Sequence, residues 1–130
     1  MANVKTWTRF LFGALFVAAG VNHFVHPQIY VAIMPPYLPW HFALVIVSGV
    51  AEVALGTLLF VRRWMALAAW GLIALLVAVF PANIHMAMHP ELYPAIPEVA
   101  LWIRLPLQGV LIAWAYWYTR GAPANEAAAA

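Results

Sequence analysis

The sequence predicts an all-α integral membrane four-helix bundle with both termini cytoplasmic and short, proline-rich outer loops. Of the 130 residues, 67% are hydrophobic and only 8% are charged, whereas a soluble domain carries roughly 25% charged residues. Four apolar runs are long enough to cross a bilayer core of about 30 Å, which needs roughly 20 helical residues. The cations also gather on one side of a four-span arrangement, as described below.

The first predicted span covers residues 7–25. It ends at His26 and Pro27, because proline lacks a backbone donor and disfavours helix in the residue before it. Gly13 and Gly20 recur seven residues apart within this span. Small residues in membrane helices permit close approach of a neighbour, so we expect these glycines to face another helix.

The second predicted span covers residues 42–61 and ends at a pair of arginines. Ser48, Glu52 and Gly56 are spaced four residues apart, which places them on one face of the helix. A polar and small-residue stripe in an otherwise apolar helix is expected to face other helices rather than lipid.

The third and fourth predicted spans cover residues 64–84 and 99–118, and a connection with three prolines separates them. All four spans fit in one domain over residues 1–120, followed by a flexible tail over residues 121–130 to which no function is assigned. No second domain has room in a chain of this length.

Orientation follows from the positive residues, because Lys and Arg in short loops are retained on the cytoplasmic side. The cations on the side predicted to be cytoplasmic are Lys5, Arg9, Arg62, Arg63 and Arg120. The two outer connections contain no Lys or Arg and carry Glu91 and Glu98. We therefore predict both termini to be cytoplasmic, in a bacterial inner (cytoplasmic) membrane.

Composition excludes several functions. The six Lys and Arg residues are too few and too scattered for a nucleic-acid surface, so no nucleic-acid partner is expected. The chain has no cysteine, which excludes disulfide exchange, thiolate metal sites and iron-sulfur ligation by its own residues.

Charged side chains inside a membrane are costly and mark functional sites by default. Counted from the span ends at about 1.5 Å per residue, Glu52 lies roughly 15 Å deep, Arg104 roughly 8 Å and Gln108 roughly 14 Å. Arg104 and Gln108 share a helix face, and Pro106 between them frees a backbone carbonyl.

These residues predict a polar pocket that opens outward, with Glu52 and Gln108 at its floor, Arg104 on its wall and histidines at its mouth. The six expected pocket residues are His23, Glu52, Asn83, His85, Arg104 and Gln108. Glu52 is the candidate proton carrier, and no catalytic residue is otherwise assigned. The alternative is that Glu52 and Arg104 form a structural pair that sets the helix register.

Metal binding is a further alternative. His85 and His89 are four residues apart, as a metal site on one helical face requires, and His23 and His26 are expected at a similar height. Pro90 follows directly, so the helix is not expected to reach His89. The sequence therefore favours a site without metal. In the metal-binding alternative, these four histidines are the candidate ligands.

Five stretches, together with Pro27, Tyr30 and Gly56, carry a family resemblance: Gly20–Phe24, Met34–Pro39, Ser48–Glu52, Phe80–Ile84 and Trp102–Gln108. In order and spacing they resemble the DoxX-like membrane protein family, over roughly residues 7–114. The resemblance implies a four-helix membrane domain and makes Glu52, Asn83, Arg104 and Gln108 characteristic positions. It also implies a link to membrane redox partners, after a subunit associated with thiosulfate:quinone oxidoreductase, or a role in assembling other membrane proteins.

Together these features predict a small membrane subunit that supports an oxidoreductase or a quinone-like ligand site, rather than an autonomous enzyme. The alternatives are a non-catalytic accessory or assembly factor and a small-solute transporter, although four spans without inverted repeats are unusual for a transporter. The expected partners are the lipid bilayer and either a larger membrane redox complex or further copies of the chain.

Overall fold

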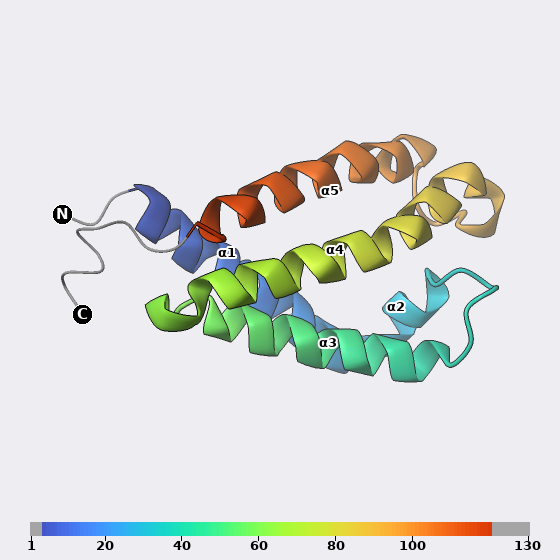
Figure 1. The fold of residues 1–130 in the computed structure, drawn as a ribbon. Coiled ribbons are helices and arrows are strands. Elements are labelled where there is room, and N and C mark those ends of the chain that lie inside the picture. Colours follow the sequence, from blue (N-terminus) through green and yellow to red (C-terminus); the bar gives the residue numbers. More distant parts are fainter. Residues whose placement is uncertain (1–3, 121–130) are drawn as a thin grey trace.

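The computed structural model describes residues 4–120, and every regular element in that range is helical (Figure 1). The long helices are α1 (Val4–Val25), α3 (His41–Leu58), α4 (Met65–Met88) and α5 (Glu98–Tyr118). The short ones are α2 (Pro27–Ala32), η1 (Arg62–Trp64) and η2 (Pro90–Leu92). Four helices are long and apolar enough to cross a membrane, which confirms the all-α prediction. The predicted tail over 121–130 lies outside the described residues.

The helix bounds correct the sequence prediction in three places. A short helix, α2, begins at Pro27, where a helix was expected only to end, because the first position of a helix needs no N–H partner. The third span continues beyond its predicted end to Met88, through Pro81, because neighbouring helices can supply the missing polar partners. Helix α3 ends at Leu58 rather than at residue 61.

The four long helices form two closely packed pairs, α1 with α3 and α4 with α5, and the pairs are joined mainly through α3 and α4. Glycines bring α1 and α3 together. A Cβ atom on Gly13 would lie 2.8 Å from the carbonyl oxygen of Gly56, and one on Gly20 would lie 2.7 Å from that of Gly49. The backbones are therefore in contact, which confirms that Gly13, Gly20 and Gly56 face another helix.

Aromatic side chains close the terminal end of the bundle, defined as the end that holds the start of α1, η1 and the end of α5. The Trp114 indole N–H donates to the Tyr118 hydroxyl at 2.6 Å, and this hydroxyl donates to Thr8 Oγ1 at 2.8 Å. Phe12 packs edge-on against Trp114, with ring centroids 4.5 Å apart. These contacts tie α5 to α1 around a core that all four long helices share.

Arg9 also lies at the terminal end, with the other cations, but its side chain is almost fully buried in α1. Its guanidinium lies over the ring of Phe10 and donates to the sulfur of Met65 at 3.1 Å. This arginine therefore contributes to the packing of the bundle as well as to the charge of that end.

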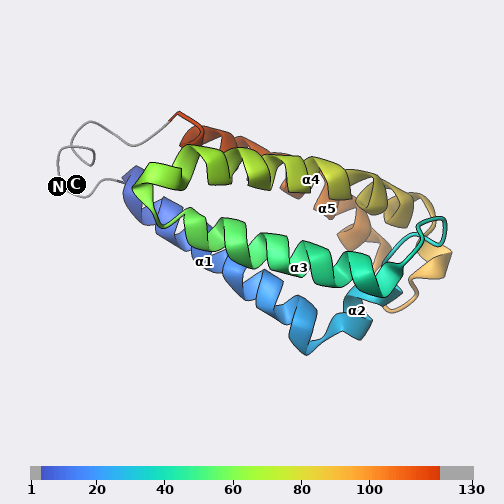
Figure 2. The ribbon, with the colours of Figure 1, turned by 60° about the horizontal axis from the view of Figure 1, so that its bottom comes forward.

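The opposite end, called the loop end, holds the connections over residues 26–40 and 89–97. Figure 2 shows α2 turning from the end of α1 toward the start of α3 at this end. A second, smaller core forms here from Met86, Tyr93 and Leu101, with Ile33 of the first connection packed against it. This turn brings Tyr30 of α2 over His23 of α1.

Candidate functional site

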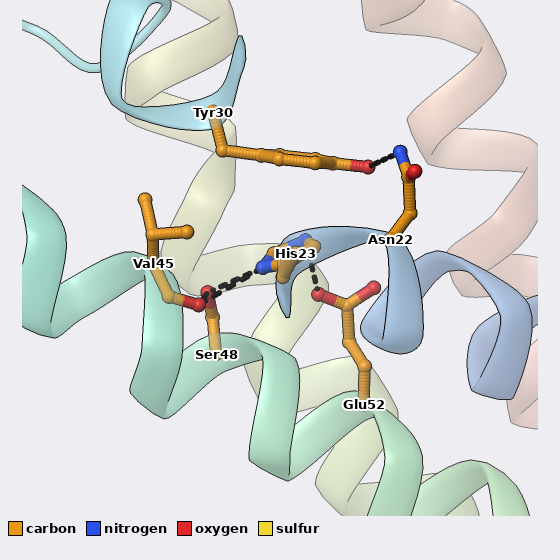
Figure 3. A network of polar contacts seen from close by, with 6 residues as sticks. All are labelled: Asn22, His23, Tyr30, Val45, Ser48 and Glu52. Atoms are coloured by element: carbon orange, nitrogen blue, oxygen red, sulfur yellow. Dashed lines mark hydrogen bonds and ion pairs between the residues drawn. The ribbon is translucent and has the colours of Figure 1, made fainter. Parts of the chain in front are cut away.

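A histidine and a glutamate form a buried polar contact between α1 and α3 (Figure 3). His23 Nε2 lies 2.9 Å from Glu52 Oε2, and the two side chains are 10% and 12% exposed. The glycines place them: Gly49 lies so close that a Cβ atom there would be 2.8 Å from the Cβ of His23. The contact between His23 and Glu52 thus depends on the close approach of the α1 and α3 backbones at Gly20 and Gly49, about one turn away.

The other nitrogen of His23 determines where the protons lie. His23 Nδ1 is 3.0 Å from the carbonyl oxygen of Val45, which also accepts a hydrogen bond from Ser48 Oγ at 3.0 Å. A carbonyl oxygen can only accept, so we assign the proton to Nδ1. Nε2 and Glu52 then share one proton, because an unprotonated imidazole nitrogen and a carboxylate would repel each other at this distance.

The shared proton has an electrostatic consequence. With the proton on the carboxyl group both side chains are neutral, and with the proton on the imidazole the two charges cancel. The His23–Glu52 pair is therefore neutral overall in either form, and a neutral pair is far less costly inside a membrane than an isolated carboxylate.

Tyr30 of α2 covers this pair. Its ring lies over the imidazole of His23, with centroids 3.9 Å apart, and its hydroxyl accepts a hydrogen bond from Asn22 Nδ2 at 2.7 Å (Figure 3). The sequence prediction did not place Tyr30 among the six pocket residues. The signal that would have found it is Pro27, since a helix starting there turns the chain back over α1.

A second group of polar side chains joins α4 to α5. Asn83 Nδ2 donates to Gln108 Oε1, and Gln108 Nε2 donates to the carbonyl oxygen of Leu76. Pro81 has no N–H, so the carbonyl of Val77 lacks its usual helical donor, and Gln108 binds the neighbouring carbonyl in the same disturbed turn. The amide of Gln108 is thus buried yet satisfied on both sides.

A pocket lies beside this group. It is lined by the polar side chains of Asn83, Arg104 and Gln108 and by the apolar side chains of Leu76, Val79, Leu107 and Leu111. Arg104 is half-buried there and lies within electrostatic range of the Tyr30 hydroxyl. Tyr30 therefore links the two groups, because it stacks on His23 and lies within electrostatic range of Arg104.

His85 belongs to a third group, at the loop end. Its ring stacks on His89 with centroids 4.4 Å apart, and Tyr37 meets it edge-on at 5.3 Å. The Tyr93 hydroxyl lies 3.4 Å from His85 Nδ1. Burial, and to a lesser degree the nearby Tyr37, raises the pKa of Tyr93, so this phenol stays protonated at neutral pH.

The structure therefore separates the six predicted pocket residues into three groups: His23 with Glu52, Asn83 with Arg104 and Gln108, and His85. Glu52 takes His23 as its ion-pair partner rather than Arg104. The four metal candidates do not gather, since His23 lies at Glu52, and within residues 4–120 no three His, Cys, Asp or Glu side chains are grouped to hold a metal ion.

Comparison with known proteins adds a family. No curated protein and no solved structure matches this chain. A family model described as Domain of unknown function (DUF8561) matches residues 12–119, a range that includes all six predicted pocket residues. The resemblance to DoxX-like proteins stays a prediction. Because the match covers most of the chain, the protein belongs to the family described as Domain of unknown function (DUF8561).

Proposed function

We propose that this protein is a small membrane subunit that binds the polar head of a lipophilic, quinone-like ligand in the pocket between α4 and α5, in support of an oxidoreductase. The observation that carries the proposal is the buried contact between His23 Nε2 and Glu52 Oε2 at 2.9 Å, a pair to which we assign one shared proton. The two carbonyl oxygens of a quinone take up protons when the quinone is reduced. A binding site for it therefore needs a proton donor at membrane depth.

The pocket beside Arg104 supports a lipophilic ligand. Ligand sites are mostly apolar and contain a few polar groups that fix orientation. The pocket has this composition, since four apolar side chains surround Asn83, Arg104 and Gln108. Its apolar wall suits an aromatic ring or an isoprenoid-like chain, and its polar side suits a carbonyl oxygen.

Each polar residue has a distinct role in this proposal. Arg104 donates hydrogen bonds to a ligand oxygen and favours any negative charge that develops on it. Glu52 and His23 give up their shared proton, and the remaining negative charge is favoured by the cation of Arg104. Tyr30 stacks on His23, lies within electrostatic range of Arg104, and offers its hydroxyl to the ligand's oxygen.

Titration with a short-chain quinone tests the proposal. Decylubiquinone is added to the full-length protein in detergent, and binding is followed by quenching of tryptophan fluorescence, since the chain has seven tryptophans. We expect saturable binding that weakens at least about tenfold in Arg104→Ala, as expected for loss of a charged hydrogen bond of about 1.5–3 kcal/mol. Equal binding by wild type and Arg104→Ala would overturn it.

Arg63→Ala is the matched control, because Arg63 is exposed at the terminal end, far from the pocket. This variant should bind the quinone as the wild type does. Mass spectrometry of an organic extract of the purified protein gives an independent readout, since a retained native ligand would appear in the wild type and be depleted in Arg104→Ala.

A non-catalytic accessory or assembly role is the second candidate. It is favoured by the fact that the two groups satisfy much of their own hydrogen bonding, His23 with Glu52 and Val45, and Gln108 with Asn83 and Leu76. Such networks also serve to hold helices in register. Co-purification with a cofactor-bearing membrane complex, together with no quinone binding by the isolated chain, would favour this role.

A further inference from the structure

We propose that the quinone-like ligand of this protein has a negatively charged head, as an ionised hydroxyquinone has at neutral pH, and that Arg104 selects it. This inference rests on the proposed function, because it concerns the same pocket, and it narrows the class of ligand. It is carried by the positive charge of the pocket, which no side chain of the described residues balances.

Arg104 brings that charge into a membrane-spanning helix, α5. A guanidinium is always ionised in proteins, and the side chain of Arg104 is half-buried. Within residues 4–120 it has no hydrogen bond and no ion pair, and the group within its electrostatic range is the Tyr30 hydroxyl. A charge inside a membrane is costly unless it is paired, so a ligand of opposite charge would be favoured here.

The acidic side chains within residues 4–120 leave this charge unbalanced. Glu52 contacts His23 at 2.9 Å, and the shared proton that we assign to them makes the pair neutral overall. Glu91 and Glu98 lie at the loop end, and neither forms an ion pair with Arg104. The pocket therefore has a net positive charge in apolar surroundings, where little water weakens the attraction for an anion.

Arg104 is also the lining group whose donors are available. Asn83 donates to Gln108, and Gln108 donates to the carbonyl oxygen of Leu76, so the donors of these amides are engaged within the bundle. An arginine can donate two parallel hydrogen bonds to a pair of oxygens. An ionised 2-hydroxyquinone presents such a pair, its hydroxyl oxygen and the adjacent carbonyl oxygen, on a ring that suits the apolar lining of the pocket.

A matched pair of ligands tests the inference. Lapachol is a 2-hydroxynaphthoquinone with a prenyl chain and is ionised at neutral pH, whereas its methyl ether has the same ring and chain without the charge. Each is titrated against the full-length protein in detergent, with quenching of tryptophan fluorescence as the readout. The preference is the affinity for lapachol divided by that for the ether. Comparing this preference between variants cancels the partition of the ligands into detergent.

The preference for lapachol should be at least about tenfold larger in the wild type than in Arg104→Gln, because charged hydrogen bonds are roughly twice as strong as neutral ones. Arg104→Lys keeps the charge and should keep most of the preference. Arg63→Ala, at an exposed position of the terminal end, should keep all of it. Circular dichroism checks the fold of each variant, and Arg104→Met replaces Arg104→Gln if the latter does not fold.

An equal preference in the wild type and in Arg104→Gln would overturn the inference. The proposed function would still stand in that case if the wild type binds decylubiquinone and Arg104→Ala weakens this binding. Absence of saturable binding by any of the quinones would overturn both. Displacement of lapachol by phosphatidylglycerol would assign the positive charge to a lipid headgroup and would overturn the inference as well.

Discussion

At the scale of single residues, the membrane interior explains why Glu52 is found against His23. An isolated carboxylate there is costly, and pairing with an imidazole removes the net charge without removing the proton. Val45 determines which nitrogen faces the carboxyl group, because its carbonyl oxygen accepts from Nδ1. The carbonyl oxygen of Val45 holds the Nδ1 proton in a hydrogen bond. The proton between His23 Nε2 and Glu52 is therefore the one that can move.

Glu52→Gln should leave the bundle nearly as stable as the wild type, because a glutamine amide can donate to the unprotonated Nε2 of His23. Glu52→Ala should lower the free energy of unfolding by about 0.6–2 kcal/mol, the range for a hydrogen bond between membrane helices. Denaturation in increasing SDS, followed by circular dichroism, measures both variants. If Glu52→Gln were as destabilised as Glu52→Ala, the ionised form of the pair would be the one that stabilises the bundle.

Gln108→Leu should destabilise the protein, although the leucine side chain is apolar. The change removes the partner of Asn83 and of the Leu76 carbonyl at once, and each polar group left without a partner costs about 1–3 kcal/mol. The same SDS titration measures it. Gln28→Leu is the control, since Gln28 is exposed, and equal stability of the two variants would contradict the structural role of Gln108.

At the scale of elements, close backbone packing is concentrated in one helix pair. Helices α1 and α3 touch at two places, Gly13 against Gly56 and Gly20 against Gly49, whereas a Cβ atom added to Gly109 of α5 would meet no atom within 4 Å. The presence of a glycine alone thus does not reveal a helix contact. The paired spacing on two helices does, since glycines seven residues apart on α1 meet glycines seven apart on α3.

Gly20→Ala should strongly destabilise the α1–α3 pair. The added Cβ would lie 2.7 Å from the Gly49 carbonyl oxygen and 2.9 Å from the backbone nitrogen of Val53, so a helix backbone must move. Overpacking of this kind typically costs about 1–3 kcal/mol. The free energy of unfolding in SDS is the measurement.

Gly109→Ala provides the control for this substitution, because an added Cβ there meets open space. It should be neutral or stabilising by up to about 1 kcal/mol, since alanine favours helix more than glycine does. Equal destabilisation of the two variants would show that helix contact is not the reason for Gly20.

At the scale of the whole molecule, the bundle is polarised from one end to the other. The terminal end has a shared aromatic core and holds the cations of η1, Arg62 and Arg63. The loop end holds the acidic residues Glu91 and Glu98 together with the histidines and with Tyr30, Tyr37 and Tyr93. This asymmetry predicts that the terminal end faces the cytoplasm and the loop end faces outward.

Single cysteines test that orientation cleanly, because the chain has none of its own. Glu91→Cys and Arg63→Cys each place a thiol on an exposed residue, at opposite ends of the bundle. In intact cells a membrane-impermeant maleimide should label Glu91→Cys and not Arg63→Cys, and permeabilised cells should show labelling of both. Labelling of Arg63→Cys alone in intact cells would reverse the predicted orientation.

The sequence by itself determined the number of long, apolar helices, because apolar length and proline breaks are local properties of the chain. Only the tertiary structure decided that Glu52 meets His23 rather than Arg104, and that Tyr30 folds over the pair. The physical reason is that lipid is as apolar as a protein core. Hydropathy therefore does not distinguish the face of a helix that meets another helix from the face that meets lipid.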